Sequence, residues 1–450
     1  MQNLHTEGAQ PVPYARNTEI IEGTRYSLTL PTTDGRNVVV PFRFLEHGTP
    51  AQATVEEVVL SAREQVEILG RLHEYPGLFA AVADKEEDKI WPALKGRLSD
   101  QIAQSEAVYL FGANKIGLMI ARLCRKRGLQ VKAFLDNDPS KQGKPLDGVP
   151  VMALSEIAPG PEIIVVASGR YSNEILAQVR VSGWPRTMNL HEFLFALDAP
   201  HQAEKQAAEF TSAVLNNPYQ FVSAFVQLHD EKSRSVFDGL IRMRIHLDTS
   251  IADEFKSNFR DEYLESDYIE EQDIRYYVDG GAYIGDTLDR FEERLRRVEA
   301  AHLFEPELPA YYESLGRYAD RVEVVSYNFG LTESPSKFTY RPEYSFDPLR
   351  TLGGPIPSDL TTFGQGIPLD DVIQGPVSLI KLDIEGAEAS ALKGAARTIR
   401  EHAPKLCVCA YHRGNDLWQL ISTVKSIRPD YKVGIRHYSD IFDDTTLYFF

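Results

Sequence analysis

Charged side chains crowd the segment LIKLDIEGAE, where an apolar strand is followed by a predicted helix. Three carboxylates, Asp383, Glu385 and Glu388, fall within six residues. Carboxylates this close repel one another, so we expect a protonated member or a nearby cation. At the ligand-binding edge of a sheet, such a group is a candidate general base. The alternative is that Glu385 and Glu388 only favour the positive N-terminus of the following helix.

A histidine occupies a comparable place in CAYHRGNDLWQL, just past another apolar strand. If both strands belong to one sheet, His412 lies at the same edge as Asp383 and could accept a hydroxyl proton. A structural role for His412 is equally open, and His437, within a strand, is assigned to structure. Carboxylates and histidine at these spacings define no fixed coordination geometry, so a divalent metal is left undecided.

A glycine-rich turn in YYVDGGAYIGDTLDRF joins a predicted strand to a helix. Gly281 and Gly285 let the backbone turn sharply and approach a ligand closely. Asp279, at the strand end, suits a cationic ligand and would repel a pyrophosphate, which indicates the methionine part of S-adenosylmethionine. Glu305 ends the next strand, where a carboxylate can accept both ribose hydroxyls. Asn328 ends a third strand and is placed for the adenine edge.

These motifs, in this order, resemble the FkbM family of methyltransferases. The resemblance covers about residues 275–450 and rests on D-G-G-A-x-x-G, F-E-P, N-x-G-L, P-L-D-D and K-L-D-I-E-G-A-E-x-x-x-L-K-G-A. It implies a class I methyltransferase fold with a reversed last strand. It also implies active-site duty for Asp383 and Glu385, and cofactor contacts from Asp279, Gly281, Gly285, Glu305 and Asn328. Tyr283 stands where many members have asparagine, a departure that bears on the methionine pocket.

The function that this resemblance implies is S-adenosylmethionine-dependent O-methylation of a hydroxyl on a sugar, glycoconjugate or related natural product. The expected partner is therefore a small-molecule or glycan acceptor. The alternative is a nucleotide- or nucleotide-sugar-binding regulatory protein whose methyltransferase-like domain is not catalytic. The two hypotheses differ in whether the cofactor turns over when acceptors are supplied.

A second strand–turn–helix opening lies earlier, in LFGANKIGLMIARLCRKRG. Gly112 and Gly117 frame its turn, and Asn114 stands where a dinucleotide fingerprint has its middle glycine. Asp136 ends the following strand, a place suited to a ribose. The segment resembles the N-terminal Rossmann-like domain of some sugar-modifying proteins. A nucleotide, nucleotide-sugar or NAD site and a purely structural copy both remain open, although no Tyr-x-x-x-Lys pair for dehydrogenase chemistry is present.

The elements that position these residues alternate between strand and helix. This pattern predicts an α/β protein with two Rossmann-like three-layer αβα domains joined by a helical bridge, the second with the class I methyltransferase fold. The predicted boundaries are an accessory segment, a first α/β domain, the bridge and the methyltransferase-like domain at 1–104, 105–199, 200–265 and 266–450.

The accessory segment is expected to hold no chemistry. The stretch TRYSLTLPTTDGRNVVVPFRF predicts a β-hairpin around the Asp-Gly pair at 34–35. Thr54 with Glu57 forms a capping-box pattern, which predicts a helix over residues 55–72.

Composition narrows the class of protein. The chain has 450 residues with 43% hydrophobic content and a net charge of −17, which predicts two or three soluble domains and disfavours a nucleic-acid partner. A membrane span and a signal pattern are both missing from the sequence, and three cysteines offer no disulfide framework. We therefore expect a cytoplasmic protein, with homo-oligomerisation left open. Cys407 and Cys409 should face the same way as core residues.

Overall fold

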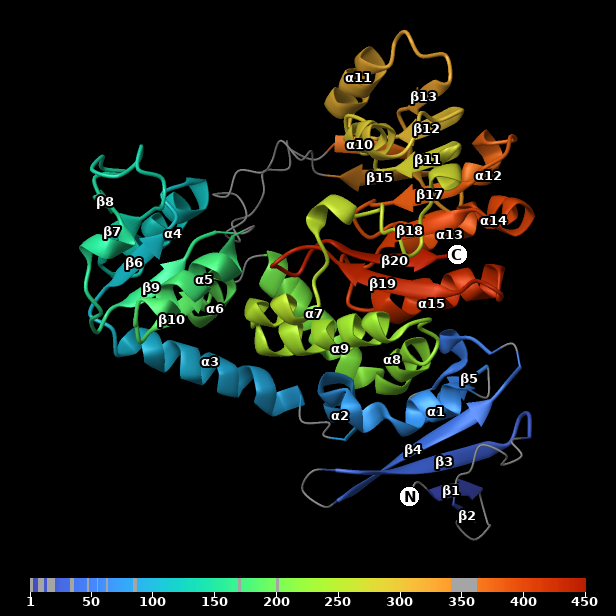
Figure 1. Cartoon of the computed structure of the whole chain (residues 1–450), viewed down its shortest axis with the longest axis horizontal. Coiled ribbons are helices and arrows are strands. Elements are labelled where there is room, and N and C mark those ends of the chain that lie inside the picture. The colour runs from blue at the N-terminus through green and yellow to red at the C-terminus, as the bar shows by residue number, and fades with distance from the viewer. Residues whose placement is uncertain are drawn as a thin grey trace.

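The computed structural model describes residues 3–6, 12–13, 21–32, 36–46, 48–54, 56–61, 64–83, 87–168, 171–199, 202–340 and 362–450. Within these ranges, no helix combines the length and the apolar character needed to cross a membrane. Three larger sheets and one small sheet are distributed along the chain, with helices between and around them (Figure 1).

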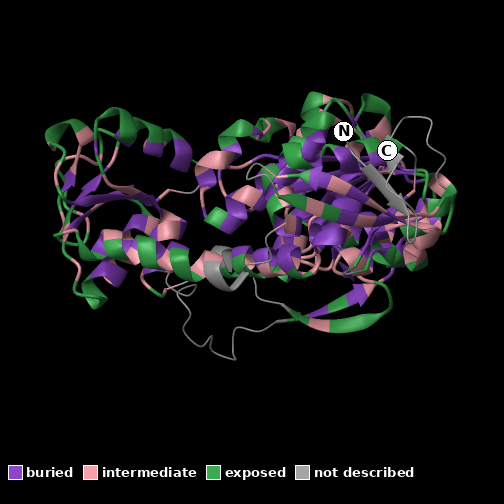
Figure 2. Ribbon diagram, turned by 90° about the horizontal axis from the view of Figure 1, so that it is seen from below, coloured by how far each residue is buried: buried purple, intermediate pink, exposed green. Residues whose placement is uncertain are grey.

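The N-terminal sheet has the strand order β2-β1-β3-β4-β5. Its strands are β1 Asn3–Thr6, β2 Val12–Pro13, β3 Arg25–Pro31, β4 Asn37–Phe44 and β5 Val58–Leu60. The predicted hairpin is confirmed, because β3 and β4 pair antiparallel, although its tip at 34–35 lies outside the described residues. Alternate residues of β3 are buried, and the hairpin turns its other face to solvent (Figure 2).

The helix predicted over residues 55–72 is wrong in its first half, and residue 55 itself lies outside the described residues. Val58, Val59 and Leu60 form β5, which pairs parallel to β4, and the helix α1 begins only at Glu64 and ends at Gly70. All three residues of β5 are buried. Pairing with the edge of β4 and burial of these three apolar side chains therefore stabilise a strand more than the local capping pattern stabilises a helix.

The five-stranded sheet that follows has the order β10-β9-β6-β7-β8, and every neighbouring pair is parallel. This confirms the strand–helix alternation read from the sequence, with the two-residue strand β8 as an unpredicted addition. Its strands are β6 Val108–Phe111, β7 Val131–Leu135, β8 Val151–Met152, β9 Ile163–Val166 and β10 Thr187–Asn189. The helices before, within and after it are α2 Pro76–Ala83, α3 Glu87–Ala103, α4 Lys115–Lys126, α5 Ser172–Val181 and α6 Leu190–Ala196.

The seven-stranded sheet has the order β13-β12-β11-β17-β18-β20-β19. Its last strand in sequence, β20, runs antiparallel to both neighbours, which confirms the predicted reversed strand. The strands are β11 Tyr276–Gly280, β12 Ala300–Phe304, β13 Val324–Tyr327, β17 Leu379–Leu382, β18 Lys405–Cys409, β19 Val433–His437 and β20 Thr445–Phe449. A small sheet beside it contains β14 Gly330–Leu331, β15 Ser336–Tyr340 and β16 Thr362–Ile367.

The helices of this unit cover both faces of the seven-stranded sheet. They are α10 Asp286–Arg294, α11 Leu308–Arg317, α12 Leu369–Val372, α13 Glu388–Gly394, α14 Ala396–His402 and α15 Asp416–Ile427. Cys407 and Cys409 of the central strand β18 lie in one buried apolar cluster, so they face the same way, as predicted.

Three further helices lie along the seven-stranded sheet, on the sides that face the other two larger sheets (Figure 1). They are α7 Gln202–Asn216, α8 Pro218–Phe225 and α9 Glu231–His246. The helix α9 packs on β19, and α8 packs on α15 and β5. These contacts belong to one continuous apolar core that links all three larger sheets.

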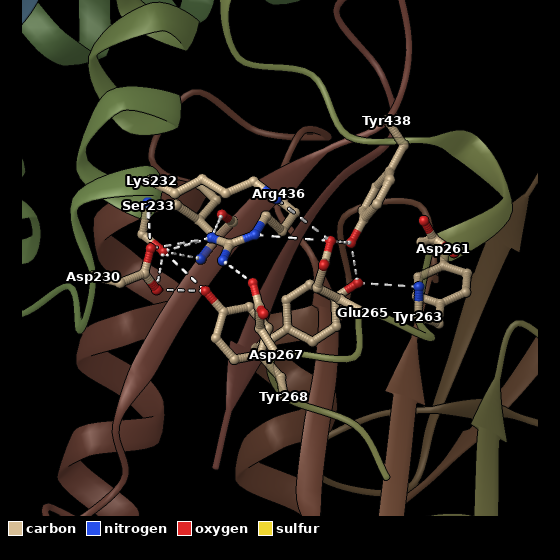
Figure 3. Close-up of polar contacts among 12 residues, drawn as sticks. Asp230, Lys232, Ser233, Asp261, Tyr263, Glu265, Asp267, Tyr268, Arg436 and Tyr438 are labelled. Atoms are coloured by element: carbon tan, nitrogen blue, oxygen red, sulfur yellow. Dashed lines mark hydrogen bonds and ion pairs between the residues drawn. The ribbon is translucent and has the colours of Figure 1, made fainter. Parts of the chain in front are cut away.

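A buried guanidinium ties α9 to the seven-stranded sheet (Figure 3). The Arg436 side chain, on β19, is 2% exposed, and its Nη1 donates to Ser233 Oγ at 2.9 Å. Its Nη2 donates to Asp267 Oδ2 at 2.9 Å. Asp230, which caps α9 through Ser233 N, also accepts from the Tyr268 hydroxyl at 2.6 Å. A buried charge is stable only when it is paired and hydrogen-bonded, so this network fixes how the helix meets the sheet.

Candidate active site

The glycine-rich turn after β11 needs glycine at both predicted positions. Gly281 has φ +73°, and a Cβ there would lie 1.8 Å from the carbonyl oxygen of Asp383. Gly285 has φ +85°, and its Cβ would lie 2.4 Å from the ring of Tyr318. Side chains rarely adopt this backbone region and find no room here. The turn after β11 therefore touches the end of β17, where the carboxylate cluster begins.

Glu305, at the end of β12, holds this turn from the side. Its Oε2 accepts the Tyr283 N–H at 2.9 Å, and its Oε1 accepts the Glu307 N–H at 2.7 Å. Each carboxylate oxygen has two lone pairs, so acceptor capacity remains for a ligand's hydroxyls. Burial raises the pKa of Glu305 to about 7, against the two backbone hydrogen bonds. A diol that donates to this carboxylate would favour its ionised form.

Asn328 lies just beyond β13 and lines a cavity of about 370 Å³ with Pro306, Tyr311, Phe329 and other residues. Its Nδ2 donates to the carbonyls of Glu305 and Pro306, each at 3.0 Å. The amide nitrogen thus secures the loop after β12. The side-chain oxygen takes part in neither of these two hydrogen bonds.

Asp279 has an internal cation as its partner, and the cofactor contact that the family resemblance implies for it stays a prediction. The carboxylate is fully buried, and its Oδ1 lies 3.1 Å from Lys381 Nζ. Lys381 also donates to the carbonyl of Gly281 at 2.8 Å. Burial raises the pKa of Asp279 to about 6, and Lys381 limits that rise. Asp279 therefore supports the glycine turn indirectly, through Lys381. In the sequence, the only indication that this lysine has a role is its position within the apolar strand LIKL.

Asp383 is the carboxylate that several elements converge on. Its Oδ2 accepts the Tyr263 hydroxyl at 3.1 Å, and its Oδ1 accepts the Tyr411 hydroxyl at 3.2 Å. Its side chain is 28% exposed, so it is open to a substrate. Burial opposes ionisation, but Lys381 and His412 hold its pKa below the usual range. Sequence reasoning missed both tyrosines: Tyr263 stands in no motif, and Tyr411 was passed over although it directly precedes His412.

Glu388 and Glu385 have different surroundings. Glu388 is fully buried, and its Oε1 accepts the N–H groups of Ile384 at 3.0 Å and Gly386 at 3.3 Å. These contacts support the structural interpretation of Glu388, because its carboxylate holds the turn before α13 by accepting two backbone hydrogen bonds. Glu385 has a 73% exposed side chain and φ +56°, so it lies on the rim of the site.

His412 supplies the cation that the carboxylate cluster requires. Its Nδ1 lies 3.0 Å from Glu388 Oε1, and its Nε2 lies 3.6 Å from Asp383 Oδ1 and 3.8 Å from Glu385 Oε2. Burial alone would lower the pKa of His412, but Glu388 and the other two carboxylates raise it to about 9. His412 is therefore protonated at neutral pH, which leaves Asp383 as the candidate base.

The same cluster has the composition of a metal site. Asp383, Glu388 and His412 each offer one ligand atom, and these atoms lie within 4.8 Å of one another. An imidazolium has no lone pair for a metal, so a bound cation and a protonated His412 exclude each other.

Comparisons with known proteins agree with this geometry. Residues 279–433 match the family model of the methyltransferase FkbM domain. The chain carries a methyltransferase FkbM domain. The crystal structure of methyltransferase FkbM from Methylobacillus flagellatus KT overlays on 81% of this chain and 99% of its own, with a TM-score of 0.61 and 23% identity. The shared fold thus extends well beyond the FkbM domain.

Two further matching structures are far less similar. Fibrillarin from Aeropyrum pernix, in complex with natively bound S-adenosyl-L-methionine, overlays on 40% of this chain and 69% of its own, with 10% identity and a TM-score of 0.27. An rRNA methylase from Streptococcus thermophilus covers 46% of this chain and 93% of its own, with 14% identity and a TM-score of 0.26. No curated protein matches the chain.

The residues singled out in the five-stranded sheet lie outside the FkbM domain. Gly112 follows β6 with φ +129°, and Asn114 caps α4 by accepting the Gly117 N–H at 2.9 Å. A Cβ at Gly117 would lie 2.0 Å from the Gly112 carbonyl oxygen, so the helix starts against the strand end. Asp136 follows β7 and accepts the Ala113 N–H at 2.9 Å. These four residues meet at one edge of that sheet.

The protonation of His412 in the FkbM domain predicts a pH-dependent stability. Its folded pKa of about 9 exceeds the unfolded value of about 6.5, so its stabilising effect is complete below the lower value and is lost as pH rises through the higher one. From neutral pH upward, we expect the cost of His412→Gln to the free energy of unfolding to fall progressively as the pH rises through about 9. Urea denaturation across this range measures the difference between the two proteins.

His437→Gln is the matched control for this measurement. Burial lowers the pKa of His437 to about 3, so His437 stays neutral throughout the range above its unfolded pKa. The cost of His437→Gln should therefore not change with pH there. A cost of His412→Gln that is equally constant would show that His412 is not the cation of the cluster.

Proposed function

We propose that this chain is an S-adenosylmethionine-dependent methyltransferase that methylates a hydroxyl of a sugar, glycoconjugate or related natural product. The observation that carries the proposal is the contact between Gly281 and the Asp383 carbonyl, where a Cβ would be 1.8 Å away. A cofactor over the glycine turn would thus have its reactive end beside the Asp383 carboxylate.

The start of α10 supports a cofactor without phosphates. A helix N-terminus attracts anions, but Asp286 and Asp289 lie in the first turn of α10. Their carboxylates would repel a pyrophosphate placed there. Glu305 remains available for ribose hydroxyls, and Asn328 for the base. This combination favours S-adenosylmethionine over a dinucleotide.

The reaction would depend mainly on proximity and alignment. S-adenosylmethionine, when bound, supplies an electrophilic methyl group. Asp383 would accept the proton of the acceptor hydroxyl as the new oxygen–carbon bond forms and the sulfur–methyl bond breaks, with S-adenosylhomocysteine as the leaving group. Tyr263 and Tyr411 donate to the two oxygens of this carboxylate and thereby fix its orientation. His412, as an imidazolium, keeps Asp383 ionised at neutral pH, and Glu385 on the rim is placed to contact the acceptor.

Glu305→Ala tests the cofactor site. The substitution removes the acceptor for two ribose hydroxyls, so binding of S-adenosylhomocysteine should weaken by about 1.5–3 kcal/mol for each charge-assisted hydrogen bond. Isothermal titration measures the affinity, and thermal melting verifies that the turn held by Glu305 remains folded. Glu313→Ala, on the exposed face of α11, is the control and should leave the affinity unchanged. A folded wild-type protein that binds neither S-adenosylmethionine nor S-adenosylhomocysteine would refute the cofactor.

The acceptor class is tested by release of S-adenosylhomocysteine from S-adenosylmethionine when hydroxylated acceptors are supplied. We expect turnover with free sugars, glycosides or hydroxylated polyketides, and an ether-type methyl signal in the product by NMR. Turnover that is confined to amine or carbon acceptors would refute O-methylation. Cofactor binding without turnover on any acceptor would favour the regulatory alternative.

A further inference from the structure

A second cavity opens at the carboxyl ends of β6, β7 and β9, outside the FkbM domain. Its volume is about 410 Å³, and its lining includes Gly112, Asp136, Lys141 and Tyr171. In the five-stranded sheet, β7 and β9 lie on opposite sides of β6, so the chain order reverses at this point. Open α/β sheets bind ligands at such a switch point. If this unit were a purely structural copy of a nucleotide-binding domain, side chains could fill the crevice, but the crevice is open.

Asp136 is held in this cavity in the same way as Glu305 is held in the FkbM domain. Its Oδ2 accepts the Ala113 N–H from the glycine turn at 2.9 Å, and its Oδ1 accepts the Asp138 N–H, two residues on, at 2.9 Å. Lys141 Nζ lies 3.0 Å from Oδ2. In both units, a carboxylate after the second strand is aimed at the turn after the first strand. The arrangement that suits a ribose in the FkbM domain is therefore present twice.

The two units differ where a phosphate would bind. The first turn of α4 contains no acidic residue and begins with Lys115, whereas that of α10 contains Asp286 and Asp289. The N–H groups of Lys115 and Ile116, at the first two positions of α4, have no intrahelical acceptor. An anion is therefore favoured at the start of α4 and repelled at the start of α10.

The remaining wall of the cavity suits a planar base. Tyr171 is 55% exposed and lines the cavity together with Ile175 of α5, and the same helix contributes Glu174 and Gln178 to the lining. Aromatic and aliphatic side chains of this kind stack against nucleobases. The volume is near the lower end of the range for ligand pockets, about 300–1,000 Å³, which favours a mononucleotide over a dinucleotide.

We propose that the five-stranded unit binds a nucleoside phosphate, independently of the cofactor of the FkbM domain. The ribose hydroxyls donate to Asp136, the phosphates lie at the start of α4 beside Lys115, and the base packs against Tyr171. The inference requires no methyl transfer, so it stands apart from the proposed function.

The test is a calorimetric titration of the full-length protein with ADP, GDP and UDP. S-adenosylhomocysteine is present at saturation, so that the FkbM site cannot accept the probe. At least one diphosphate should bind with a Kd on the order of micromolar. Its 2′,3′-dideoxy analogue should bind at least about tenfold more weakly, because Asp136 then loses the hydroxyl donors. Asp136→Asn should weaken the natural diphosphate to a similar extent and leave the affinity for S-adenosylhomocysteine unchanged.

Lys115→Glu provides a variant that does not disturb the turn, because Lys115 is exposed. It should weaken diphosphate binding by about tenfold and reduce its salt dependence, since an attraction to phosphate becomes a repulsion. Lys126→Glu, exposed at the other end of α4, is the matched control and should leave the affinity unchanged. Absence of binding by all three diphosphates, or equal binding of the dideoxy analogue, would overturn the proposal. So would binding that Glu305→Ala abolishes and Asp136→Asn spares, because the probe would then occupy the FkbM domain.

Discussion

Asp383→Asn should lower methyl-transfer turnover by about 10²–10⁴-fold, the usual effect of removing a positioned proton acceptor. The amide keeps the size of the carboxylate. Its oxygen can still accept from one of the two hydroxyls, those of Tyr263 and Tyr411, which lie 3.1 and 3.2 Å from the two carboxylate oxygens, and its nitrogen can donate to the other. It cannot accept a proton from the substrate hydroxyl. Because the atoms of Asp383 that crowd Gly281 are backbone atoms, which the substitution keeps, S-adenosylhomocysteine affinity should stay within about twofold of the wild type.

The controls separate catalysis from folding. Asp371→Asn, at an exposed position of α12, should leave both turnover and affinity unchanged. Thermal melting of each variant gives the folded fraction by which turnover is normalised. If Asp383→Asn lowers the melting temperature but keeps wild-type turnover per folded molecule, Asp383 has only a structural role. His412 would then be the next residue to test.

Lys381→Met should lower the free energy of unfolding by about 3–5 kcal/mol, because it leaves a buried carboxylate without its cation. Asp279 is fully buried, and Lys381 Nζ, 3.1 Å away, is its ion-pair partner. Methionine is close to lysine in size, so the cavity term is small. Chemical denaturation near neutral pH measures the loss. Since the pKa of Asp279 is already about 6 beside the lysine, it should rise further in the variant, and the loss should shrink as pH falls and Asp279 protonates.

The double variant Asp279→Asn with Lys381→Met is the test of this cause. Removal of both charges should recover much of the stability that Lys381→Met loses, although the Gly281 carbonyl still loses a hydrogen bond from the lysine. If the losses of the two single variants simply add in the double variant, the ion pair is not what stabilises the β11–β17 contact.

The chain contains two similar strand–glycine turn–helix units, and the differences between them indicate how each would select its ligand. Both units place a carboxylate after the second strand against the glycine turn of the first, at Asp136 and at Glu305. The two units differ in charge at the start of the following helix: the first turn of α10 is acidic, and α4 begins with a lysine. The electrostatics of one helix turn would thus direct a sulfonium cofactor to one site and a phosphate to the other.

The sequence by itself determined the features that depend on local geometry. The positive φ angles at Gly281 and Gly285 require glycine, and the apolar runs before Asp279, Asp383 and His412 end within about two residues of the strand ends. Parallel strands present their carboxyl ends at one edge, so these motifs could be placed together before any coordinates. The reversed β20 was predicted on a different basis, the resemblance to the FkbM family, and not from local geometry.

Only the tertiary structure decided the partners and the charge states. Tyr263 reaches Asp383 across 120 residues of sequence, and Lys381 neutralises Asp279 from a neighbouring strand. The proton on His412 depends on burial together with three carboxylates. Burial and Coulomb energies depend on distances that no local pattern encodes. The helix predicted over residues 55–72 was wrong in its first half for the same reason. Val58–Leu60 form a strand because they pair with β4, a contact that the local capping pattern does not encode.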